Sequence, residues 1–239
     1  MKVSVILPTY NEREVIVAVV REILSAVPEA EVLVVDDDSP DHTWETVERA
    51  FVGNARVRVR RRVGRRGLPS AIAEGIAATD GDVVVWLDAV MSAEVVPTLC
   101  ATTEDADVVV ASRYVPGGGD SRDARGRVLA SRAINLLGSA CLGGAVRDWT
   151  SGFVAARRTA LERVPIRTHY VYGDYCIDFL YRACRTGLRV VEVPYWLPDR
   201  RAGETKTSGS VARFGLLGLR YVETILTLRW HTLSGRKEA

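Results

Sequence analysis

Short apolar runs alternate with segments of helical periodicity along the first half of the chain. The runs have the length and composition of buried strands and cover the following segments: Val3–Leu7, Glu31–Val35, Asp82–Leu87 and Val108–Ala111. Between them, apolar positions at helical spacing predict helices that begin near Asn11, Thr43 and Leu68. Continuous apolar strands that alternate with helices are typical of a mostly parallel sheet covered on both faces. The sequence therefore predicts an α/β fold.

The pattern changes after the glycine run Gly117–Gly119. Two helices are expected there, Val128–Leu142 and Tyr175–Thr186, with a short run at Gly152–Ala156 between them and a strand at Arg189–Val193 after them. A polar loop, Asp199–Gly209, leads into a long apolar segment at helical spacing, Val211–Leu233. Because no internal repeat or low-complexity linker interrupts the chain, we expect one domain over residues 1–209 and a C-terminal amphipathic helix with its tail over residues 210–239.

Composition excludes several classes of protein. The chain has 239 residues, of which 47% are hydrophobic and 26% charged, so it is neither disordered nor fibrous. The 32 basic and 30 acidic residues give a formal charge of +2, which does not indicate a nucleic-acid binder. The four cysteines show no zinc-site spacing, and the N-terminal segment lacks the apolar region of a signal peptide. No uncharged apolar stretch is long enough to span a bilayer, so we expect a cytoplasmic protein, soluble or peripheral to a membrane.

Polar residues cluster where three of the predicted strands end, and ligands of parallel sheets bind at that edge. These segments are Pro8–Glu12, Asp36–Asp41 and Asp88–Ser92. Adjacent carboxylates at 36, 37 and 38 repel one another unless cations or hydrogen-bond donors compensate them. Two interpretations are open: a solvated turn, or a site in which Asp37 accepts hydrogen bonds from a base or ribose. Asp88 is equally open between a helix cap and a ligand site.

Several short motifs, taken in their order along the chain, resemble those of a known protein family. They comprise the following segments: Pro8–Glu12, Val34–Asp41, Arg66–Leu68, Gly81-Asp82, Leu87–Ala89, Ser112–Tyr114, Ser131-Arg132, Asp148–Phe153 and Asp199–Lys206. In order and spacing this set resembles the family 2 glycosyltransferases of GT-A fold. It is similar in particular to the dolichyl- and polyprenyl-phosphate mannosyltransferases. The resemblance implies a Rossmann-like, mostly parallel sheet flanked by helices.

The resemblance also implies roles for matching positions. The nucleotide base and ribose of GDP-mannose would be held by five residues: Pro8, Tyr10, Glu12, Val35 and Asp37. Asp88 and Ala89 would lie beside the diphosphate, and Arg200 and Lys206 would close over its phosphates. Fixed cations stabilise the negative charge of a leaving nucleoside diphosphate.

Arg113 and Arg132 are the candidates for capturing the acceptor phosphate. A lipid phosphate carries its own anionic oxygen, so the nucleophile needs capture and aim, which arginine supplies, rather than a general base. The catalytic set implied in this way is Asp88, Arg113, Arg132, Arg200 and Lys206.

The chain departs from the family pattern at the expected metal site. The family carries Asp-x-Asp, whereas this sequence reads Asp88-Ala89-Val90, and valine offers no oxygen to Mg²⁺ or Mn²⁺. Asp178 aligns with a second acidic position, so Asp88 and Asp178 are the implied metal ligands, but Cys176 replaces the glutamine that the family places nearby. The family implies Mg²⁺ or Mn²⁺, and these departures leave metal dependence open.

The resemblance predicts an inverting transferase that moves mannose from GDP-mannose to a polyprenyl or dolichyl phosphate. It would act peripherally at the cytoplasmic membrane face, where a membrane subunit is a further candidate partner. One alternative is a related transferase that uses another nucleotide sugar, such as UDP-glucose, or another acceptor. A second alternative is a weakly active homologue that only binds a nucleotide sugar or a membrane partner.

Two segments have two interpretations each. The arginine-rich segment Arg56–Arg66 is either an exposed edge strand blunted by charge or a contact for anionic lipid headgroups. Val211–Leu233 is either an interfacial amphipathic helix or a helix packed on the domain or a partner.

Overall fold

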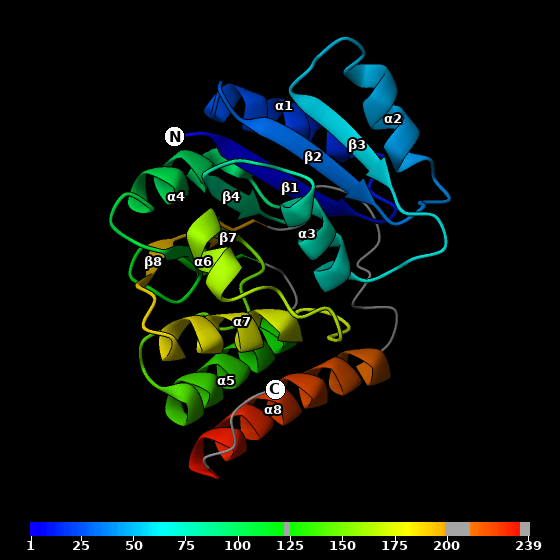
Figure 1. Ribbon diagram of the computed structural model, residues 1–239. Helices are drawn as coiled ribbons and strands as arrows, with labels where there is room; N and C mark the ends of the chain where they lie inside the picture. Colours follow the sequence, from blue (N-terminus) through cyan, green and yellow to red (C-terminus); the bar gives the residue numbers. More distant parts are fainter. Residues whose placement is uncertain (122–124, 199–210, 235–239) are drawn as a thin grey trace.

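The computed structural model of the chain describes residues 1–121, 125–198 and 211–234 (Figure 1). A seven-stranded sheet has the order β3-β2-β1-β4-β7-β5-β8. Its strands are β1 (Val3–Thr9), β2 (Glu31–Asp36), β3 (Val57–Arg61), β4 (Val83–Trp86), β5 (Val108–Ser112), β7 (Val154–Arg157) and β8 (Val190–Pro194). A two-stranded sheet joins β6 (Gly119–Asp120) to β9 (Trp196–Leu197).

Eight α-helices surround the sheet in the described part of the chain. They are α1 (Ile16–Ala26), α2 (Thr43–Ala50), α3 (Leu68–Ala77), α4 (Val96–Thr102), α5 (Arg125–Leu142), α6 (Arg158–Arg163), α7 (Asp174–Arg185) and α8 (Val211–Leu233). A 3-10 turn, η1 (Ala93–Val95), precedes α4. The predicted α/β fold with a mostly parallel sheet is confirmed, and the C-terminal helix has the predicted bounds.

One strand of the main sheet runs against the others. β7 pairs antiparallel with both β4 and β5, whereas every other pairing in the sheet is parallel. The sequence shows a short run at residues 152–156 but carries no signal for its direction, because β7 is inserted between two strands that precede it in the chain. Because both faces of the sheet are covered, the side chains of Val154, Ala155 and Ala156 are fully buried.

The sheet separates two hydrophobic cores. α1, α2 and α4 cover one of them, with Ile23 and Leu99 fully buried there (Figure 1). α3, α6 and α7 cover the other, which contains Ile72 and Phe179. Burial on both faces explains why the central strands read as continuous apolar runs rather than as alternating ones.

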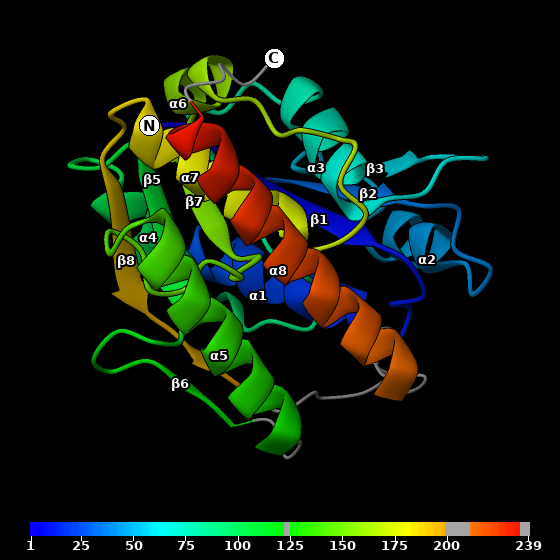
Figure 2. The ribbon, with the colours of Figure 1, turned by 90° about the horizontal axis from the view of Figure 1, so that it is seen from below.

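α5 and α8 form an additional layer outside α7. They lie side by side across one face of the molecule (Figure 2), and α8 contacts both α5 and α7. Ile225 and Leu228 of α8 are buried in the core that α7 covers, and the hydroxyl groups of Tyr181 and Thr232 are hydrogen-bonded. The interpretation of the C-terminal helix as packed on the domain is therefore confirmed for this face of α8. The predicted boundary between residues 209 and 210 lies outside the described residues.

A candidate nucleotide and acceptor site

The three polar segments that follow β1, β2 and β4 lie along one edge of the sheet. β2, β1 and β4 are adjacent and parallel, so their carboxyl ends meet there. The register pairs Thr9 with Asp36 at the end of β1 and β2. The sequence-based expectation that these segments come together is confirmed.

Asp36 ties the ends of β1 and β2 together. Its carboxylate is fully buried and accepts hydrogen bonds from the Thr9 hydroxyl at 2.7 Å and the Ser39 hydroxyl at 2.6 Å. The backbone N–H of Ser39 donates a third, at 2.8 Å. Because Asp37 is also only 7% exposed, the solvated-turn interpretation is wrong for positions 36 and 37, whereas Asp41 does accept from the N–H of Thr43 at the start of α2 at 3.0 Å. The carboxylates at 36 and 37 are built into the fold.

Asp37 is held by two donors from later segments. The Arg62 Nη1 donates to its Oδ1 at 2.8 Å, and the backbone N–H of Gly67 donates to its Oδ2 at 2.8 Å. Burial raises the pKa of Asp37 above its ordinary value, against the lowering effects of Gly67 and Arg62. Next to it, Asp38 is paired with Arg61 at 2.6 Å. The predicted compensation of the adjacent carboxylates by cations is confirmed.

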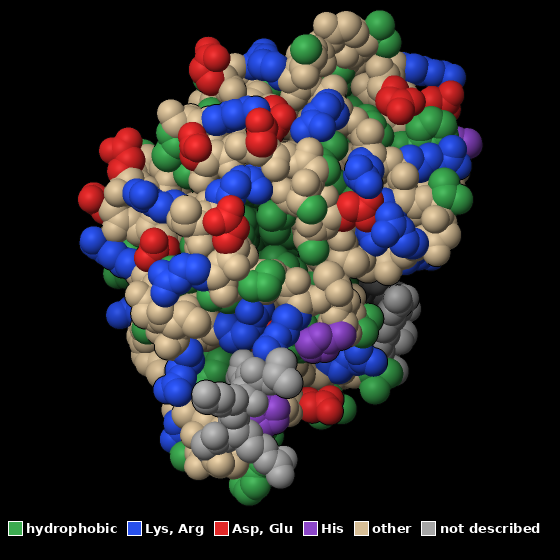
Figure 3. Space-filling model, in the orientation of Figure 1, with side chains coloured by type: hydrophobic (Ala, Val, Ile, Leu, Met, Phe, Trp, Pro, Cys, Tyr) green, Lys and Arg blue, Asp and Glu red, His purple; other side chains and the backbone are tan. Residues whose placement is uncertain are grey.

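The arginine-rich segment is an edge strand whose charges are largely paired. β3 is the last strand of the sheet, and Val57 and Val59 alternate with exposed arginines. The pairs are Arg58 with Glu31, Arg60 and Arg65 with Glu74, Arg61 with Asp38, and Arg62 with both Asp37 and Glu74. Figure 3 shows basic and acidic side chains intermixed over this part of the surface. The edge-strand interpretation is confirmed, and the pairing argues against a free basic patch for lipid headgroups.

Other residues of the predicted nucleotide site have distinct surroundings. Tyr10 is half-buried, and the guanidinium of Arg66 lies 4.0 Å from its ring centre and hydrogen-bonds its hydroxyl. Glu12 is buried, and its backbone N–H donates to Thr43 Oγ1 at 2.9 Å. The side chain of Val35 is fully buried in the core beside α3. A nucleotide contact at Val35 would therefore have to come from its backbone.

Asp88 and Ala89 follow β4 at the centre of this edge, together with Pro8 at the end of β1. Asp88 and Pro8 are half-buried, and Ala89 is 2% exposed. The backbone carbonyl of Asp88 accepts a hydrogen bond from the N–H of Met91 at 3.0 Å, which forms a turn around Ala89 and Val90. This turn brings the predicted diphosphate-binding residues to the same edge as Asp37.

The described residues do not fit a divalent ion held by Asp88 and Asp178. Asp178 is fully buried, with Oδ1 3.1 Å from Arg167 Nη1 and Oδ2 2.7 Å from Arg182 Nη2. These ion pairs argue against the metal role that the resemblance implies for Asp178. Cys176 is no substitute ligand, because burial raises the pKa of its thiol, which donates to the Ser151 carbonyl at 2.7 Å. No group of three His, Cys, Asp or Glu side chains in residues 1–121, 125–198 and 211–234 could hold an ion.

Arg113 is the centre of the predicted acceptor site and is itself tightly held. Its Nε and Nη2 donate to the two oxygens of Asp148 at 2.8 and 2.7 Å, and its Nη2 also donates to Thr150 Oγ1 at 2.8 Å. Burial alone would lower the pKa of Arg113, but the Asp148 carboxylate outweighs it and raises the pKa. The Nη1 atom lies 3.7 Å from Oδ2 of Asp120, whose side chain is 1% exposed, so a second carboxylate also pairs with this guanidinium.

Arg132 lies close to this network but differs from Arg113 in exposure. It lies on α5, where the neighbouring Ser131 accepts a hydrogen bond from the Tyr114 hydroxyl at 2.9 Å. This bond joins the segments that carry the two arginines. The Arg132 side chain is exposed and makes no ion pair with the residues that the structure describes. Arg200 and Lys206 lie outside the described residues, and their roles stay predictions.

From the sequence, Asp148 is included in a family motif but no role is predicted for it. Nor is Arg62 distinguished from the other arginines of residues 56–66. Asp148 could have been found as the acid beside two arginine motifs. Arg62 could not, because its burial depends on the register between β2 and β3.

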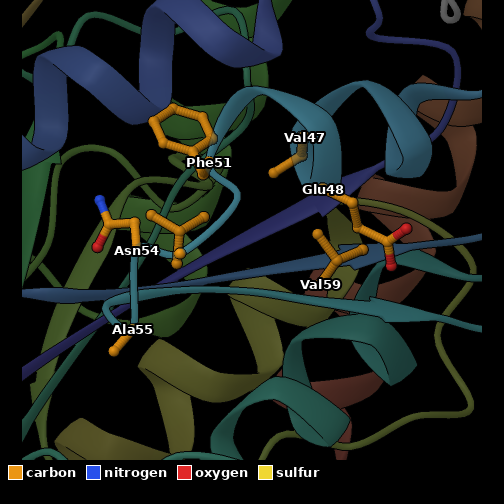
Figure 4. Close-up of a pocket in the computed structure, with 8 residues that line it drawn as sticks. Val47, Glu48, Phe51, Asn54, Ala55 and Val59 are labelled. Carbon is orange, nitrogen blue, oxygen red and sulfur yellow. The ribbon is translucent and has the colours of Figure 1, made fainter.

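The hollow between α2 and β3 is not part of this site. It measures about 470 Å³ and is lined by residues that include Val47, Phe51, Asn54 and Val59 (Figure 4). Its lining includes the turn just before β3, at the opposite end of the strand from Arg61. None of the predicted site residues contributes to it.

Comparisons with known proteins agree with this geometry. Residues 4–164 match the Glycosyl transferase family 2 profile, so the chain belongs to that family and is a glycosyltransferase. It is 36% identical to polyprenol monophosphomannose synthase of Mycolicibacterium smegmatis, covering 90% of this chain and 87% of that protein. It is 34% identical to undecaprenyl-phosphate mannosyltransferase of Micrococcus luteus, covering 99% of both chains. A dolichol-phosphate mannosyltransferase of Pyrococcus furiosus is 36% identical, over 87% of this chain and 60% of that protein.

Solved structures share the fold. Glucosyl-3-phosphoglycerate synthase from Mycobacterium tuberculosis, in complex with Mn²⁺, UDP and phosphoglyceric acid, superposes with a TM-score of 0.72 at 24% identity. The match covers 95% of this chain and 78% of that one. The same enzyme has been crystallised with Mg²⁺ and UDP. The likeness confirms the predicted GT-A fold, and these neighbours bind divalent metals.

Proposed function

We propose that this chain transfers mannose from GDP-mannose to a polyprenyl or dolichyl phosphate, with inversion at the anomeric carbon. The observation that carries the proposal is the similarity, along most of the chain, to enzymes named for polyprenyl-phosphate mannose synthesis. The site supports it, because Asp37 and Asp88 lie at the carboxyl edge where such sheets bind nucleotides.

The proposed reaction is a single displacement. An anionic oxygen of the lipid phosphate attacks the anomeric carbon of mannose and forms the new C–O bond. The bond from that carbon to the diphosphate oxygen breaks, and GDP leaves with the electron pair. No proton has to be removed from the nucleophile, so the site needs positioning and charge stabilisation rather than a base. Arg113 and Arg132 would aim the acceptor phosphate, and Arg200 and Lys206 would stabilise the departing diphosphate.

A nucleotide panel tests the donor. We expect GDP to bind more tightly than UDP, ADP or CDP in isothermal titration calorimetry. With purified protein and GDP-mannose, GDP release should require added polyprenyl phosphate. Tighter binding of UDP, together with UDP release from UDP-glucose in the same assay, would show that the donor is UDP-glucose and not GDP-mannose.

We also propose that α5 and α8 place the enzyme on a membrane surface. The structure shows no helix in its described residues that is long and apolar enough to cross a membrane. The outer face of this helix pair nevertheless exposes large apolar side chains, which are Leu129 and Leu136 on α5 and Leu216, Leu219, Leu226, Trp230 and Leu233 on α8. The α8 residues recur at spacings that place them on one stripe.

Charge supports a lipid surface as the partner of this stripe. Arg132, Arg220 and Arg229 are exposed on the same two helices, and anionic headgroups attract such residues. Apolar side chains interspersed with arginines are typical of helices that lie in the membrane interface. The arrangement would bring Arg132 near the headgroup region, where the phosphate of a polyprenyl acceptor lies. We place this surface at the cytoplasmic membrane face.

Flotation with liposomes tests the surface. The double variant Leu226→Ser/Trp230→Ser should lose most of its binding to vesicles that contain anionic lipid and should keep its GDP affinity. Val52→Ser is the matched control, because Val52 is 83% exposed but lies beyond the end of α2, away from α5 and α8. Vesicle binding of the double variant at the level of the control would remove the proposed surface.

One observation favours a second candidate function. Val90 and the ion-paired Asp178 leave Asp88 without the second acid that the family pattern provides. A homologue that binds a nucleotide sugar without transferring the sugar would have the same feature. Nucleotide binding without any product, under all metal conditions, would support this candidate.

A further inference from the structure

Arg62 is the buried member of an otherwise exposed group of arginines. Its side chain is 2% exposed, whereas those of Arg58, Arg60 and Arg61 on β3 are 43–50% exposed. Its backbone N–H donates to the Asp36 carbonyl at 2.8 Å, which continues the pairing of β2 with β3 by one residue. A buried arginine costs free energy unless its donors are satisfied, so its partners indicate what it stabilises.

The guanidinium of Arg62 joins three segments of the fold. Nη1 donates to Asp37 Oδ1 at 2.8 Å and to the Gly67 carbonyl at 3.3 Å. Nη2 donates to Ser70 Oγ at 2.6 Å, in the first turn of α3. Nε lies 3.3 Å from Glu74 Oε2, an ion-pair distance without hydrogen-bond geometry. One side chain thus connects the end of β2, the turn before α3 and α3 itself.

Both backbone polar groups of Gly67 are hydrogen-bonded to this pair of side chains, Asp37 and Arg62. Asp37 accepts a hydrogen bond from the N–H of Gly67, while Arg62 donates to the carbonyl of the same residue. Gly67 has φ = 142°, a conformation that side chains disfavour, so glycine is needed there. The preceding residue, Arg66, stacks on Tyr10 at the end of β1. The position of the Arg66–Tyr10 pair therefore depends on the contacts of Arg62 and Asp37.

We propose that Arg62 is a positioning residue of the nucleotide site, which holds Asp37 and the Gly67 turn in the geometry that binds the base or ribose of a nucleoside diphosphate. This inference rests on the proposed function, in which Asp37 and Tyr10 contact the nucleotide. Each Asp37 oxygen accepts one of these two hydrogen bonds, from Arg62 or Gly67, and a carboxylate oxygen has the capacity to accept a second, which in this proposal comes from the nucleotide. Arg62 acts through these groups and does not touch the reacting atoms.

Arg62→Met tests the proposal, with Arg58→Met as the matched control from the same strand. We expect Arg62→Met to weaken GDP binding about tenfold or more, because hydrogen bonds to charged groups are stronger than neutral ones. Its KM for GDP-mannose should rise, while kcat at saturating donor and the KM for polyprenyl phosphate should change less than threefold. Arg58→Met should bind GDP as the unmodified protein does.

Two further variants keep the test decisive if Arg62→Met does not fold. Arg62→Lys retains the charge but cannot reach Asp37 and Ser70 together, so its GDP affinity should lie between those of the unmodified protein and Arg62→Met. Ser70→Ala removes one partner of Nη2 and should weaken GDP binding by a smaller factor. Unchanged GDP affinity in folded Arg62→Lys and Ser70→Ala would overturn the proposal.

The pH dependence of binding gives a readout that a purely structural role would not move. The charged groups that act on Asp37 are Arg62, Asp36 and Arg66. Loss of Arg62 removes a cation, so Asp37 should accept a proton at higher pH and GDP binding should weaken more steeply on acidification than in Arg58→Met. Equal pH profiles would contradict the role. Failure of the unmodified protein to bind any nucleoside diphosphate would instead refute the proposed function.

Discussion

Arg113 and Asp148 form a bidentate ion pair inside the protein, with donor–acceptor distances of 2.8 and 2.7 Å. The backbone N–H of Arg113 donates to the same carboxylate at 3.0 Å. Asp148 is fully buried, and its own backbone N–H donates to Glu192 on β8 at 2.8 Å. The pair thus joins the end of β5 to the segment before β7 and fixes the direction of the guanidinium. In the proposed reaction, this rigidity holds the Arg113 guanidinium in a fixed position for the acceptor phosphate.

Replacement of Asp148 should destabilise the protein strongly. Asp148→Asn removes the bidentate carboxylate from the buried guanidinium of Arg113 and leaves only Asp120, 3.7 Å from Nη1, as a charged partner, which costs about 3–5 kcal/mol of unfolding free energy. Urea unfolding followed by circular dichroism measures the change. Thr150→Val is the comparison, since it removes the neutral hydroxyl that accepts from Arg113 and Asn135 while the Arg113–Asp148 ion pair stays, and it should cost less, about 1–3 kcal/mol. Equal stability of Asp148→Asn and the unmodified protein would show that the pair does not support the fold.

Arg132 should act on the acceptor and not on the donor. Its exposed guanidinium is available to a phosphate, so Arg132→Gln should raise the KM for polyprenyl phosphate about tenfold, as expected for loss of a hydrogen bond between charged groups. GDP affinity should stay unchanged. Arg49→Gln, an exposed arginine on α2, provides the control. A rise confined to the KM for GDP-mannose would place Arg132 at the donor instead.

Val90 should control the response to divalent metals. Val90→Asp introduces a carboxylate two residues after Asp88, and carboxylate oxygens are ligands that Mg²⁺ and Mn²⁺ prefer. We expect this variant to bind Mn²⁺ more tightly than the unmodified protein, and calorimetry with Mn²⁺ alone measures this. Val90→Asn introduces an uncharged side chain of the same size as aspartate, so its affinity for Mn²⁺ should rise less than that of Val90→Asp. Equal Mn²⁺ affinity in all three proteins would show that position 90 does not face the ion.

GDP binding should weaken as the pH falls. Burial raises the pKa of Asp37 above its ordinary value of 3.8, so this carboxylate takes up a proton at a higher pH than an exposed aspartate does. The protonated form loses acceptor positions and its attraction to Arg62. Calorimetric titration of GDP from neutral into mildly acidic pH measures the effect. In Asp37→Asn the affinity should be low and less dependent on pH, and an unchanged profile would exclude Asp37 as the titrating group.

The sequence predicts the fold well because its signals are local. The strands that became β1, β2, β4 and β5 are apolar runs of strand length, and periodicity predicts α1, α2, α3 and α8, although α1 begins at Ile16 rather than near Asn11. The short α4 was not predicted, because Pro97 and its seven-residue length obscure the helical pattern. The direction of β7 depends on strands distant in sequence, and no local pattern encodes it.

The candidate site was predicted in composition but not in contacts. The motifs identify Asp37, Asp88 and Arg113, and the structure brings their segments to the carboxyl side of the sheet. The partners of these residues come from other strands and helices, as Arg62 does for Asp37 and Asp148 for Arg113. Alignment with a family motif placed Asp178 at a metal, whereas Arg167 and Arg182 neutralise it. Pairings of this kind depend on tertiary packing and require the structure.

The central claim is mannosyl transfer to a lipid phosphate, and one assay tests it directly. GDP-mannose labelled in the sugar is incubated with the purified protein and polyprenyl phosphate, in the presence of Mg²⁺, Mn²⁺ or EDTA, and the organic phase is counted. We predict that label enters the organic phase only when polyprenyl phosphate is present, and that Arg113→Ala abolishes it. An organic phase without label under every metal condition, from protein that still binds GDP, would contradict the proposed transfer.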